Sequence, residues 1–308
     1  MNDRSVRRET LVAGSDVRGE RLDCFIVDQL EGVSRKSVKR ALDGGRVFVD
    51  GRSERRANLL LKGGEIISLT LEGDSPRPDI AELEILYRDE HLLAVNKPDG
   101  LPAHPTTDGR INALDLVCRQ CPGLGPILLH RLDVHTTGVL LFALTAAANR
   151  DLARQFAERQ VAKTYLALVA GAPPDQFTVS NYLKGGVRGR TVAVRTGGVR
   201  AETAFHTLAA GPGFALVEAR PKTGRTHQIR SHLAAEGYPL LGDSLYGGPV
   251  AVTLDKHPLH VRRHLLHALR LIVQHPQSRE PLCLCAALPA DFQVLWSGLV
   301  SPPSLLFV

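Results

Sequence analysis

The residues best suited to chemistry lie in the middle of the 308-residue chain, directly before a wholly apolar segment. Residues 130–137 read HRLDVHTT, and residues 139–144, after Gly138, read VLLFAL. Imidazole, guanidinium and carboxylate groups stand close together here, and these groups serve acid–base and nucleophilic catalysis. A polar cluster that enters a buried strand is typical of an active-site loop on a fixed scaffold. The alternative is that Arg131 and Asp133 form a buried ion pair that only holds the loop.

Two later segments also place polar groups beside apolar ones. Residues 163–171, KTYLALVAG, indicate a strand that carries Tyr165, and the alternative role of this residue is that of a core aromatic. Residues 226–237, THQIRSHLAAEG, indicate a helix that ends at its glycine. His227 and Arg230 are three residues apart and lie near each other on one face of this helix, whereas Ile229 faces inward.

Patterns that bind cofactors or metals are lacking. The sequence has no phosphate-cradling glycine-rich loop, no nucleotide-binding fingerprint and no metalloprotease motif. His260, His264 and His267 have helical spacing, but a strand-like apolar run follows them and no acidic residue completes a zinc site. Cys118 and Cys121 have CxxC spacing without the second pair that a zinc ribbon needs. We therefore expect neither a metal nor a cofactor.

Composition narrows the class of protein. Apolar residues make up 44% of the chain and charged residues 23%, which is the profile of a soluble globular protein. No apolar run approaches the ~20 residues that cross a bilayer, and residues 1–16 lack the apolar core of a secretory signal. The odd count of five cysteines favours reduced thiols. We expect a cytoplasmic, monomeric protein without a membrane partner.

The positive charge is concentrated in one short segment. Residues 35–62 contain nine basic and three acidic residues, a net of +6, which equals the formal net charge of the whole chain. The remainder of the chain is therefore neutral. This distribution is expected of a small module that binds a polyanion and is attached to a neutral body.

The elements around this segment form a helix–helix–hairpin pattern. Residues 21–31 have apolar residues at helical spacing, and Ser34 can cap a second helix that ends at Gly44 and Gly45. A strand, VFV, leads through an Asp50–Gly51 turn to a second apolar segment that ends in EIISLTL. Basic groups follow the exposed helix face and the turn; those that we expect to bind the polyanion are Arg35, Lys36, Lys39, Arg40, Arg46 and Arg52.

This order of elements resembles the small RNA-binding module named after ribosomal protein S four. The resemblance covers residues 19–68 and includes the S-R-K start of the basic helix and the V-x-V-D-G turn. A charged helix face is otherwise usually a solvated face. The resemblance implies that the segment binds RNA.

The larger part of the chain changes to strand patterns. LEILY and LLAVN flank a predicted turn at residues 88–90, and a helix is expected over residues 146–159. Residues 130–145, the KTYLALVAG segment and TGRTHQIRSHLAAEGYPLLGDSLYGG resemble three ordered motifs of the RluA family of RNA pseudouridine synthases. The resemblance runs from Leu83 to Phe292.

Residue roles follow from the matching positions of these motifs. The resemblance implies that Asp133 is the catalytic carboxylate, that Tyr165 stacks on the target base and that Arg230 pairs with Asp133. Arg225 is the alternative to Arg230 in the basic role, and Arg131 would fill the space that an extruded nucleotide leaves. The implied substrate-binding set comprises Arg131, His130, Thr136, Arg225, His227 and Ile229.

The implied reaction suits these residue types. It breaks the bond from uracil nitrogen to ribose, turns the base and rejoins it through carbon, which needs no redox equivalent. A carboxylate can attack the sugar or remove a sugar proton, and the sequence leaves both routes open. The Tyr165 hydroxyl is a candidate for removing the final proton from the base. His135 and Thr137 depart from the family pattern, which affects the expected substrate preference more than the activity.

Two function classes remain open at this stage, with a third as a remote alternative. The first is a uridine isomerase of large-subunit ribosomal RNA, since relatives with this front module usually act there. The second is a noncatalytic RNA-binding or assembly factor with the same fold, and the third is a metal-dependent hydrolase that uses the histidines. The presence of Asp133, Tyr165 and Arg230 together favours the enzyme.

The resemblances also imply a domain plan and an α+β fold. Residues 1–18 would be an N-terminal tail, residues 19–72 a small α+β RNA-binding domain and residues 73–82 a linker. Residues 83–308 would form a catalytic domain built on a mixed, largely antiparallel β-sheet flanked by helices and loops.

Overall fold

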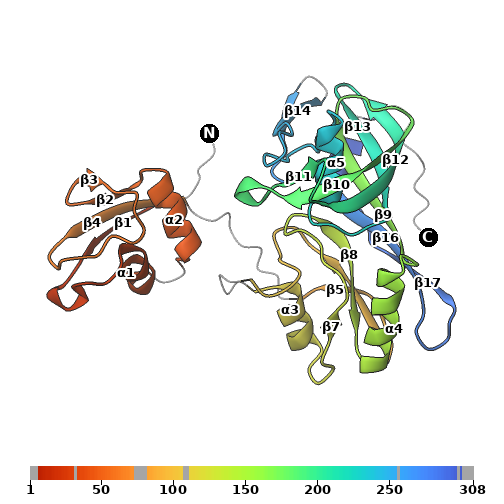
Figure 1. The fold of residues 1–308 in the computed structure, drawn as a ribbon, viewed down its shortest axis with the longest axis horizontal. Helices are drawn as coiled ribbons and strands as arrows, with labels where there is room; N and C mark the ends of the chain where they lie inside the picture. The colour runs from red at the N-terminus through yellow and green to blue at the C-terminus, as the bar shows by residue number, and fades with distance from the viewer. Residues whose placement is uncertain are drawn as a thin grey trace. The chain divides into compact units, whose positions relative to one another are not determined.

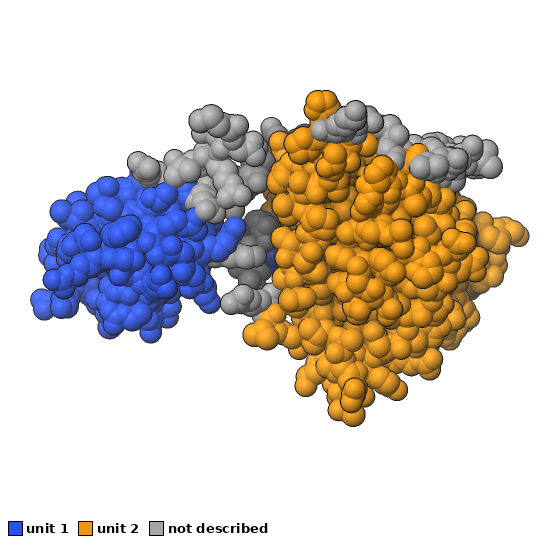
Figure 2. Space-filling model, turned by 90° about the horizontal axis from the view of Figure 1, so that it is seen from above, with its two compact units in different colours: residues 1–79, 106–110 blue, residues 80–105, 111–308 orange. Residues whose placement is uncertain are grey.

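The computed structural model describes residues 6–30, 33–72, 82–106, 111–254, 257–296 and 299. The chain forms two compact units (Figures 1 and 2): one comprises residues 1–79 and 106–110, and the other comprises residues 80–105 and 111–308. The expected linker at residues 73–82 lies outside the described residues except for Glu82. No helix in the described part of the chain is both long and apolar enough to cross a membrane.

In the described residues of the small unit, two helices pack on a four-stranded sheet. Its strands are all antiparallel and lie in the order β1-β4-β2-β3. Leu22, Phe25 and Ile26 of α1 and Val38 and Leu42 of α2 are buried against this sheet. The elements in chain order are β1 (Val6–Val12), a 3-10 turn (Ser15–Val17), α1 (Leu22–Gln29), α2 (Arg35–Asp43), β2 (Val47–Val49), β3 (Arg52–Ser53) and β4 (Ile66–Glu72).

Local signals in the sequence place α2 and the hairpin correctly. The Ser34 side chain accepts a hydrogen bond from the amide of Ser37, and Gly44 forms the C-cap. Asp50 and Gly51 both adopt positive φ angles, 49° and 75°, which a tight hairpin turn requires. The α2 helix and the turn are thus arranged as the residue pattern predicted.

Strand β1 differs from the tail expected for residues 1–18. It pairs with β4 along its whole length, from Val6 opposite Glu72 to Val12 opposite Ile66. Few apolar residues mark this strand in the sequence: Leu11 of β1 packs against the core, and Ala13, just after the strand, is buried in it. An edge strand of charged residues gave no clear alternation in the sequence, so the strand was not predicted.

The large unit is built on one mixed, largely antiparallel sheet. Within the described residues the sheet has 11 strands, nine of them in the order β11-β10-β12-β13-β9-β16-β8-β6-β5, while β17 pairs with β16 and β7 with β8. The pairing of β8 with β16 is parallel and the others are antiparallel. This architecture confirms the predicted α+β class.

The chain order explains how distant motifs meet in this sheet (Figure 1). The first half contains β5 (Glu84–Arg88), β6 (Leu92–Lys97), α3 (Ala113–Gln120), β7 (Ile127–Leu128), β8 (Thr137–Ala143), α4 (Ala146–Ala157) and β9 (Ala162–Ala170). The second half contains β10 (Gln176–Gly185), a 3-10 turn (Val187–Gly189), β11 (Thr191–Val194), β12 (Val199–Gly211), β13 (Phe214–Pro221), α5 (Gln228–Ala235), β14 (Ala251–Leu254), β15 (His257–His260), β16 (Leu266–Gln274), β17 (Pro281–Cys285) and α6 (Ala290–Trp296).

Strand β8 is buried on both faces, which is why its sequence is a continuous apolar run. Leu140 and Phe142 pack with residues of α3, whereas Val139 and Leu141 pack on the opposite face with residues of α4. Side chains alternate between the faces of a strand, so a single six-residue segment contributes to two cores. The polar loop before β8 is therefore attached to one of the most restrained strands of the sheet.

Helices α5 and α6 cover opposite faces of the central strands. Ile229 and Leu233 of α5 pack with Ala167 of β9, whereas Phe292 of α6 packs on the other face with Leu166 of that strand. Alternation along β9 places Tyr165 on the same face as Ala167. The α5 helix and Tyr165 therefore share one side of the sheet.

Gly138 marks the junction between the polar loop and β8. Its φ angle is +110°, and a Cβ at this position would overlap the backbone of Ala268, the residue opposite Gly138 in the parallel β8–β16 pair. Both conditions restrict the position to glycine. The close approach of the two backbones fixes where the loop joins the sheet.

We predict that Gly138→Ala lowers the free energy of unfolding by roughly 2–5 kcal/mol, because it adds both backbone strain and a steric overlap. Gly123→Ala is the matched control: Gly123 also has a positive φ, +85°, but no atom lies within 4 Å of the point that a Cβ would occupy there. The control should lose only about 1–2 kcal/mol. Urea unfolding of both variants measures the difference, and equal losses would contradict the role of the backbone contact.

Candidate active site

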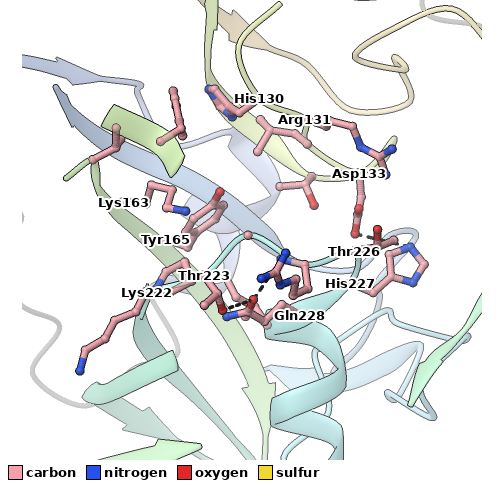
Figure 3. A pocket seen from close by; sticks show the side chains of 18 of the residues that line it. His130, Arg131, Asp133, Lys163, Tyr165, Lys222, Thr223, Thr226, His227 and Gln228 are labelled. Atoms are coloured by element: carbon pink, nitrogen blue, oxygen red, sulfur yellow. Dashed lines mark hydrogen bonds and ion pairs between the residues drawn. The ribbon is translucent and has the colours of Figure 1, made fainter. Parts of the chain in front are cut away.

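The three predicted motifs converge on one cavity of about 620 Å³ in the large unit (Figure 3). One wall comes from residues 129–136, before β8, and another from β9. The third comes from the loop and helix that follow β13. All nine catalytic and substrate-binding candidates line it: His130, Arg131, Asp133, Thr136, Tyr165, Arg225, His227, Ile229 and Arg230.

Asp133 is held by a guanidinium that is itself held by a second carboxylate. Arg230 Nη1 donates to Asp133 Oδ2 at 3.0 Å. Its Nε and Nη2 donate to the two carboxylate oxygens of Asp243 at 2.7 and 2.9 Å. The side chains of Arg230 and Asp243 are 7% and 2% exposed, whereas that of Asp133 is 23% exposed. The buried pair therefore presents Asp133 to the cavity.

These contacts keep Arg230 charged and fixed. Burial opposes its charge, but hydrogen bonds and ion pairs with Asp243 and Asp133 raise the pKa of the Arg230 guanidinium above its ordinary value. Its guanidinium carbon also lies 5.1 Å from the ring centre of Tyr246, a cation–π contact. Arg225, the alternative basic partner, instead donates from Nε to the carbonyl of Arg200 at 3.4 Å. The geometry places Arg230 on Asp133.

Two buried basic side chains, Lys97 and Arg263, hold the backbone of the loop around Asp133. The Lys97 ammonium donates to the carbonyls of Pro98, Leu101 and Val134, at 2.8–2.9 Å. Burial lowers the pKa of Lys97 to about 7, with Asp99 opposing this shift. On the other side, Arg263 Nη1 donates to the carbonyl of His135 at 2.9 Å.

Arg263 is anchored in the same way as Arg230. Its Nε and Nη2 bond the two oxygens of the Asp291 carboxylate at 2.6 and 2.8 Å, and its side chain is 4% exposed. The side chain of His135, which departs from the family pattern, lies outside this network: it is 53% exposed, with Nδ1 2.8 Å from Asp99 Oδ1.

Two buried histidines, His264 just before β16 and His267 at the start of that strand, hold the end of the loop. His264 Nε2 lies 3.0 Å from Thr136 Oγ1, and His267 Nδ1 lies 2.8 Å from Thr137 Oγ1. Burial lowers the pKa of His264 to about 2 and that of His267 to about 4, so both imidazoles are neutral at pH 7. Thr137, the other departure from the family pattern, thus has a structural hydrogen bond.

His227 lies beside Asp133 in a strained backbone conformation. It is the N-cap of α5 with φ 52° and ψ 24°, the left-handed region that side chains rarely adopt. Its Nε2 is 3.8 Å from Asp133 Oδ2, and its Nδ1 is 3.2 Å from the Tyr246 hydroxyl. Burial lowers the pKa of the His227 imidazole, although Asp133 opposes the shift.

Tyr165 presents its ring to the cavity from β9 (Figure 3). Burial, and secondarily the Asp133 carboxylate, raise the pKa of the Tyr165 hydroxyl above its ordinary value. The phenol is therefore neutral at pH 7 and suited to donate a hydrogen bond rather than to accept a proton. This result weighs against the Tyr165 hydroxyl as the group that removes a proton from the base.

The remaining cavity candidates differ in their freedom to meet a ligand. Arg131 is exposed at the cavity rim. His130 is instead committed to the fold: its Nε2 accepts from the amide of Leu141 at 3.2 Å, and its ring stacks on Phe156. Burial lowers the pKa of His130 to about 3. The His130 ring therefore positions the start of the loop.

Sequence reasoning did not single out the residues that position Arg230 and the loop. Asp243 and Tyr246 stand in the LLGDSLYGG part of the third motif, and Lys97 and Arg263 stand in segments with weak patterns. A buried charge needs a partner, so an acidic residue in an otherwise apolar and glycine-rich stretch is the one local signal for Asp243.

The basic residues of the small unit that we expect to bind RNA differ in their exposure to solvent. Arg35, Lys39, Arg40 and Arg52 are exposed. Arg46 is partly buried, and its Nη2 donates to the carbonyl of Arg40 near the end of α2 at 3.2 Å. The side chain of Lys36 lies outside the described residues.

The histidine and cysteine groups that might suggest a metal are dispersed. Among the described residues, no three His, Cys, Asp or Glu side chains gather in a metal-binding arrangement. His260 lies on β15, whereas His264 and His267 each bond a threonine of the loop. The five cysteines are free thiols.

Comparison with known proteins identifies the family. A family model described as RNA pseudouridylate synthase matches residues 91–235, which include the Asp133 loop, Tyr165 and Arg230. An RNA pseudouridine synthase of Synechocystis sp. is 34% identical over an alignment that covers 96% of this chain and 95% of the relative. The chain belongs to this family. It is accordingly an RNA pseudouridine synthase, an isomerase.

Other members of the family extend the comparison. The ribosomal large subunit pseudouridine synthase D of Xanthomonas campestris is 33% identical, with 96% of this chain and 93% of the relative covered. The solved structure of human RNA pseudouridylate synthase domain containing 4 matches with a TM-score of 0.59 and 30% identity, over 71% of this chain and 95% of that one. The catalytic fold is thus that of pseudouridine synthases.

The buried histidines predict a loss of stability in mild acid. Those with the least exposure are His264, His267 and His232, and burial lowers the pKa of His232 to about 4. The unfolded chain takes up protons below the ordinary histidine pKa of ~6.5, whereas the folded chain does not, so stability falls as pH decreases from ~6.5 toward 4. Each histidine should cost about 2 kcal/mol between pH 7 and pH 5.

Thermal melts at pH 7 and pH 5 measure this dependence. His232→Asn should show a smaller drop in Tm between the two pH values than the wild type, because one depressed imidazole is gone. His206→Asn is the control, since His206 is exposed. An identical drop in all three proteins would contradict the assignment.

Proposed function

We propose that this protein converts uridine to pseudouridine in large-subunit ribosomal RNA, with Asp133 as the catalytic carboxylate and without a cofactor. The observation that carries the proposal is a partly exposed carboxylate, fixed by Arg230, that faces a cavity beside the Tyr165 ring. Relatives named as ribosomal large subunit pseudouridine synthases support the choice of RNA.

The chemistry follows from the fact that reactant and product are isomers. No electron or group has to enter or leave, so the chain's own acid–base and nucleophilic groups suffice. Asp133 either attacks the ribose C1′ or removes a ribose proton as the bond to uracil breaks. Arg230 keeps the carboxylate oriented throughout, because its other donors are occupied by Asp243.

The target nucleotide has to leave its stacked position before it enters the cavity. Stacking on Tyr165 replaces the stacking that the base loses, and an aromatic platform contributes about 1–3 kcal/mol per base. Arg131, exposed at the rim, fills the gap in the RNA. Tyr165 acts as platform and hydrogen-bond donor, in keeping with its raised pKa.

We predict that Asp133→Asn reduces pseudouridine formation by at least ~10²–10⁴-fold, since the substitution removes the anionic and basic oxygens. The fold should lose only about 1 kcal/mol, because Arg230 keeps its bidentate pair with Asp243. The assay is tritium release from carbon 5 of labelled uridines in ribosomal RNA transcripts. Release at a tenth of the wild-type rate would remove the catalytic role from Asp133.

Asp243→Asn is the matched comparison, because it removes the other carboxylate of Arg230. Asp243 is 2% exposed, so its loss leaves a buried guanidinium without its main counter-charge. We expect a loss of ~3–5 kcal/mol of stability, as for one side of a buried ion pair. Urea unfolding separates the two variants: the first is stable and inactive, and the second is unstable.

The small unit, in this proposal, contains a ribosomal-protein-S-four-like RNA-binding module over residues 19–72, and β1 (Val6–Val12) extends its sheet by pairing with β4. Its support is the exposed basic face of α2 and the concentration of the whole net charge in residues 35–62. The module supplies affinity, and residues 83–308 supply the chemistry. We also propose that the protein is a cytoplasmic monomer.

The role of the module predicts a particular salt dependence. Replacing Arg35, Lys39 and Arg40 together by glutamine should make the negative slope of log K against log salt shallower by about 2–3, because each phosphate contact contributes about −0.7 to −0.9 to that slope. Arg56→Gln is the control, since the Arg56 guanidinium is already paired with Glu54 at 2.9 Å. Filter binding to structured RNA over a salt series provides the slopes. Unchanged slopes in the triple variant would exclude this face from the RNA interface.

A further inference from the structure

Lys163 is a partly buried cation inside the catalytic cavity. It lies on β9 two residues before Tyr165, so the two side chains project from the same face of the strand. Its ammonium lies against the loop after β13, since a Cβ on Gly224 would be 3.7 Å from Lys163 Nζ. Within the described residues, no carboxylate pairs with this ammonium and no hydrogen bond satisfies it.

The other basic groups of the cavity have partners or contact solvent. Arg230 pairs with Asp133 and Asp243, and Lys222 donates to Glu202 at 2.5 Å with its side chain directed away from the cavity (Figure 3). Arg131 and Arg159 are exposed. Lys163 differs from them in being half-buried with no hydrogen-bond or ion-pair partner among the described residues, and burial lowers the pKa of its ammonium. Such a group gains most from an arriving negative charge.

The position of Lys163 relative to Asp133 indicates which charge it meets. In Figure 3 the Tyr165 ring lies between Lys163 on one side and Asp133 on the other. A uracil that stacks on Tyr165 with its ribose toward Asp133 directs its opposite edge, which carries a carbonyl oxygen, toward Lys163.

We infer that Lys163 is a further catalytic residue: its ammonium donates a hydrogen bond to a carbonyl oxygen of the uracil and stabilises the anion that forms when the base leaves the ribose. The inference rests on the proposed function. When the C1′–N1 bond breaks, its electron pair stays on the ring and spreads over N1, O2 and O4. C5 then forms the bond to C1′, while Asp133 either leaves C1′ or returns the ribose proton that it had taken. C5 loses its proton to a base or to water and N1 takes up one proton, so that reactant and product remain isomers.

Rotation of the detached ring makes a single fixed cation sufficient. A half-turn about the line through N3 and C6 exchanges N1 with C5 and O4 with O2. The oxygen that leaves Lys163 is therefore replaced by the other carbonyl oxygen, and the anion remains stabilised during the exchange. A preorganised donor in a partly buried site is most effective at such a developing charge.

The test uses a substrate whose base stabilises its own negative charge. A target RNA fragment carries either uridine or 5-fluorouridine at the position that the wild-type protein modifies. Because 5-fluorouridine has no C5 proton to lose, both single-turnover rates are followed as loss of the starting nucleoside, by nuclease digestion and chromatography. Because fluorine withdraws electrons from the ring, the second substrate depends less on Lys163. Lys163→Met should slow the uridine reaction by ~10²–10³-fold, with RNA affinity within about 3-fold, and should slow the 5-fluorouridine reaction at least ~10-fold less.

The comparison between substrates does not depend on how much of the variant is folded. Lys222→Met is the control for the loss of one positive charge at the cavity, and any effect it has should be equal on the two substrates. Equal losses for Lys163→Met on both substrates, no loss, or a loss confined to RNA affinity would each overturn the inference. Wild-type protein that forms no pseudouridine would overturn the proposed function and, with it, this inference.

Discussion

Arg230 joins two carboxylates from distant parts of the chain, and the geometry of the cavity depends on this triad. Asp243 neutralises the buried guanidinium and fixes its plane through Nε and Nη2, which leaves Nη1 to donate to Asp133. The two carboxylates have different roles, because a buried ion pair costs desolvation energy that only good geometry offsets. The bidentate pair of Arg230 and Asp243 offsets this desolvation energy, and the partly exposed Asp133 remains available to a substrate.

The sheet brings the members of this triad together without relying on flexible segments. Asp133 stands one short turn before β8, and Arg230 stands on α5, which packs on β9 and β13. Strand β16 lies between β8 and β9 in the sheet and thereby connects both walls of the cavity. Backbone contact at Gly138 fixes the distance between β8 and β16. Loops carry the reactive groups, but strands determine their separation.

Much of this arrangement was predictable from local patterns, and the remainder depended on long-range partners. The Ser34 cap and the apolar strand β8 follow from short-range spacing, and the resemblance supplied the α+β class and the pairing of Asp133 with Arg230. Asp243 was missed because its partner is defined by tertiary packing. His264 was considered at helical spacing, yet it precedes a strand and bonds a threonine. Strand β1 was missed because edge strands tolerate charge.

The buried cations below the Asp133 loop bind its carbonyl oxygens rather than its side chains. Lys97 reaches the carbonyl of Val134 and Arg263 that of His135, while the side chain of His135 extends into solvent. A restraint that acts on the main chain is indifferent to the amino acid it holds. Position 135 can therefore vary in evolution or in directed libraries while Asp133 stays in register, so that recognition of new RNA sequences need not disturb the catalytic carboxylate.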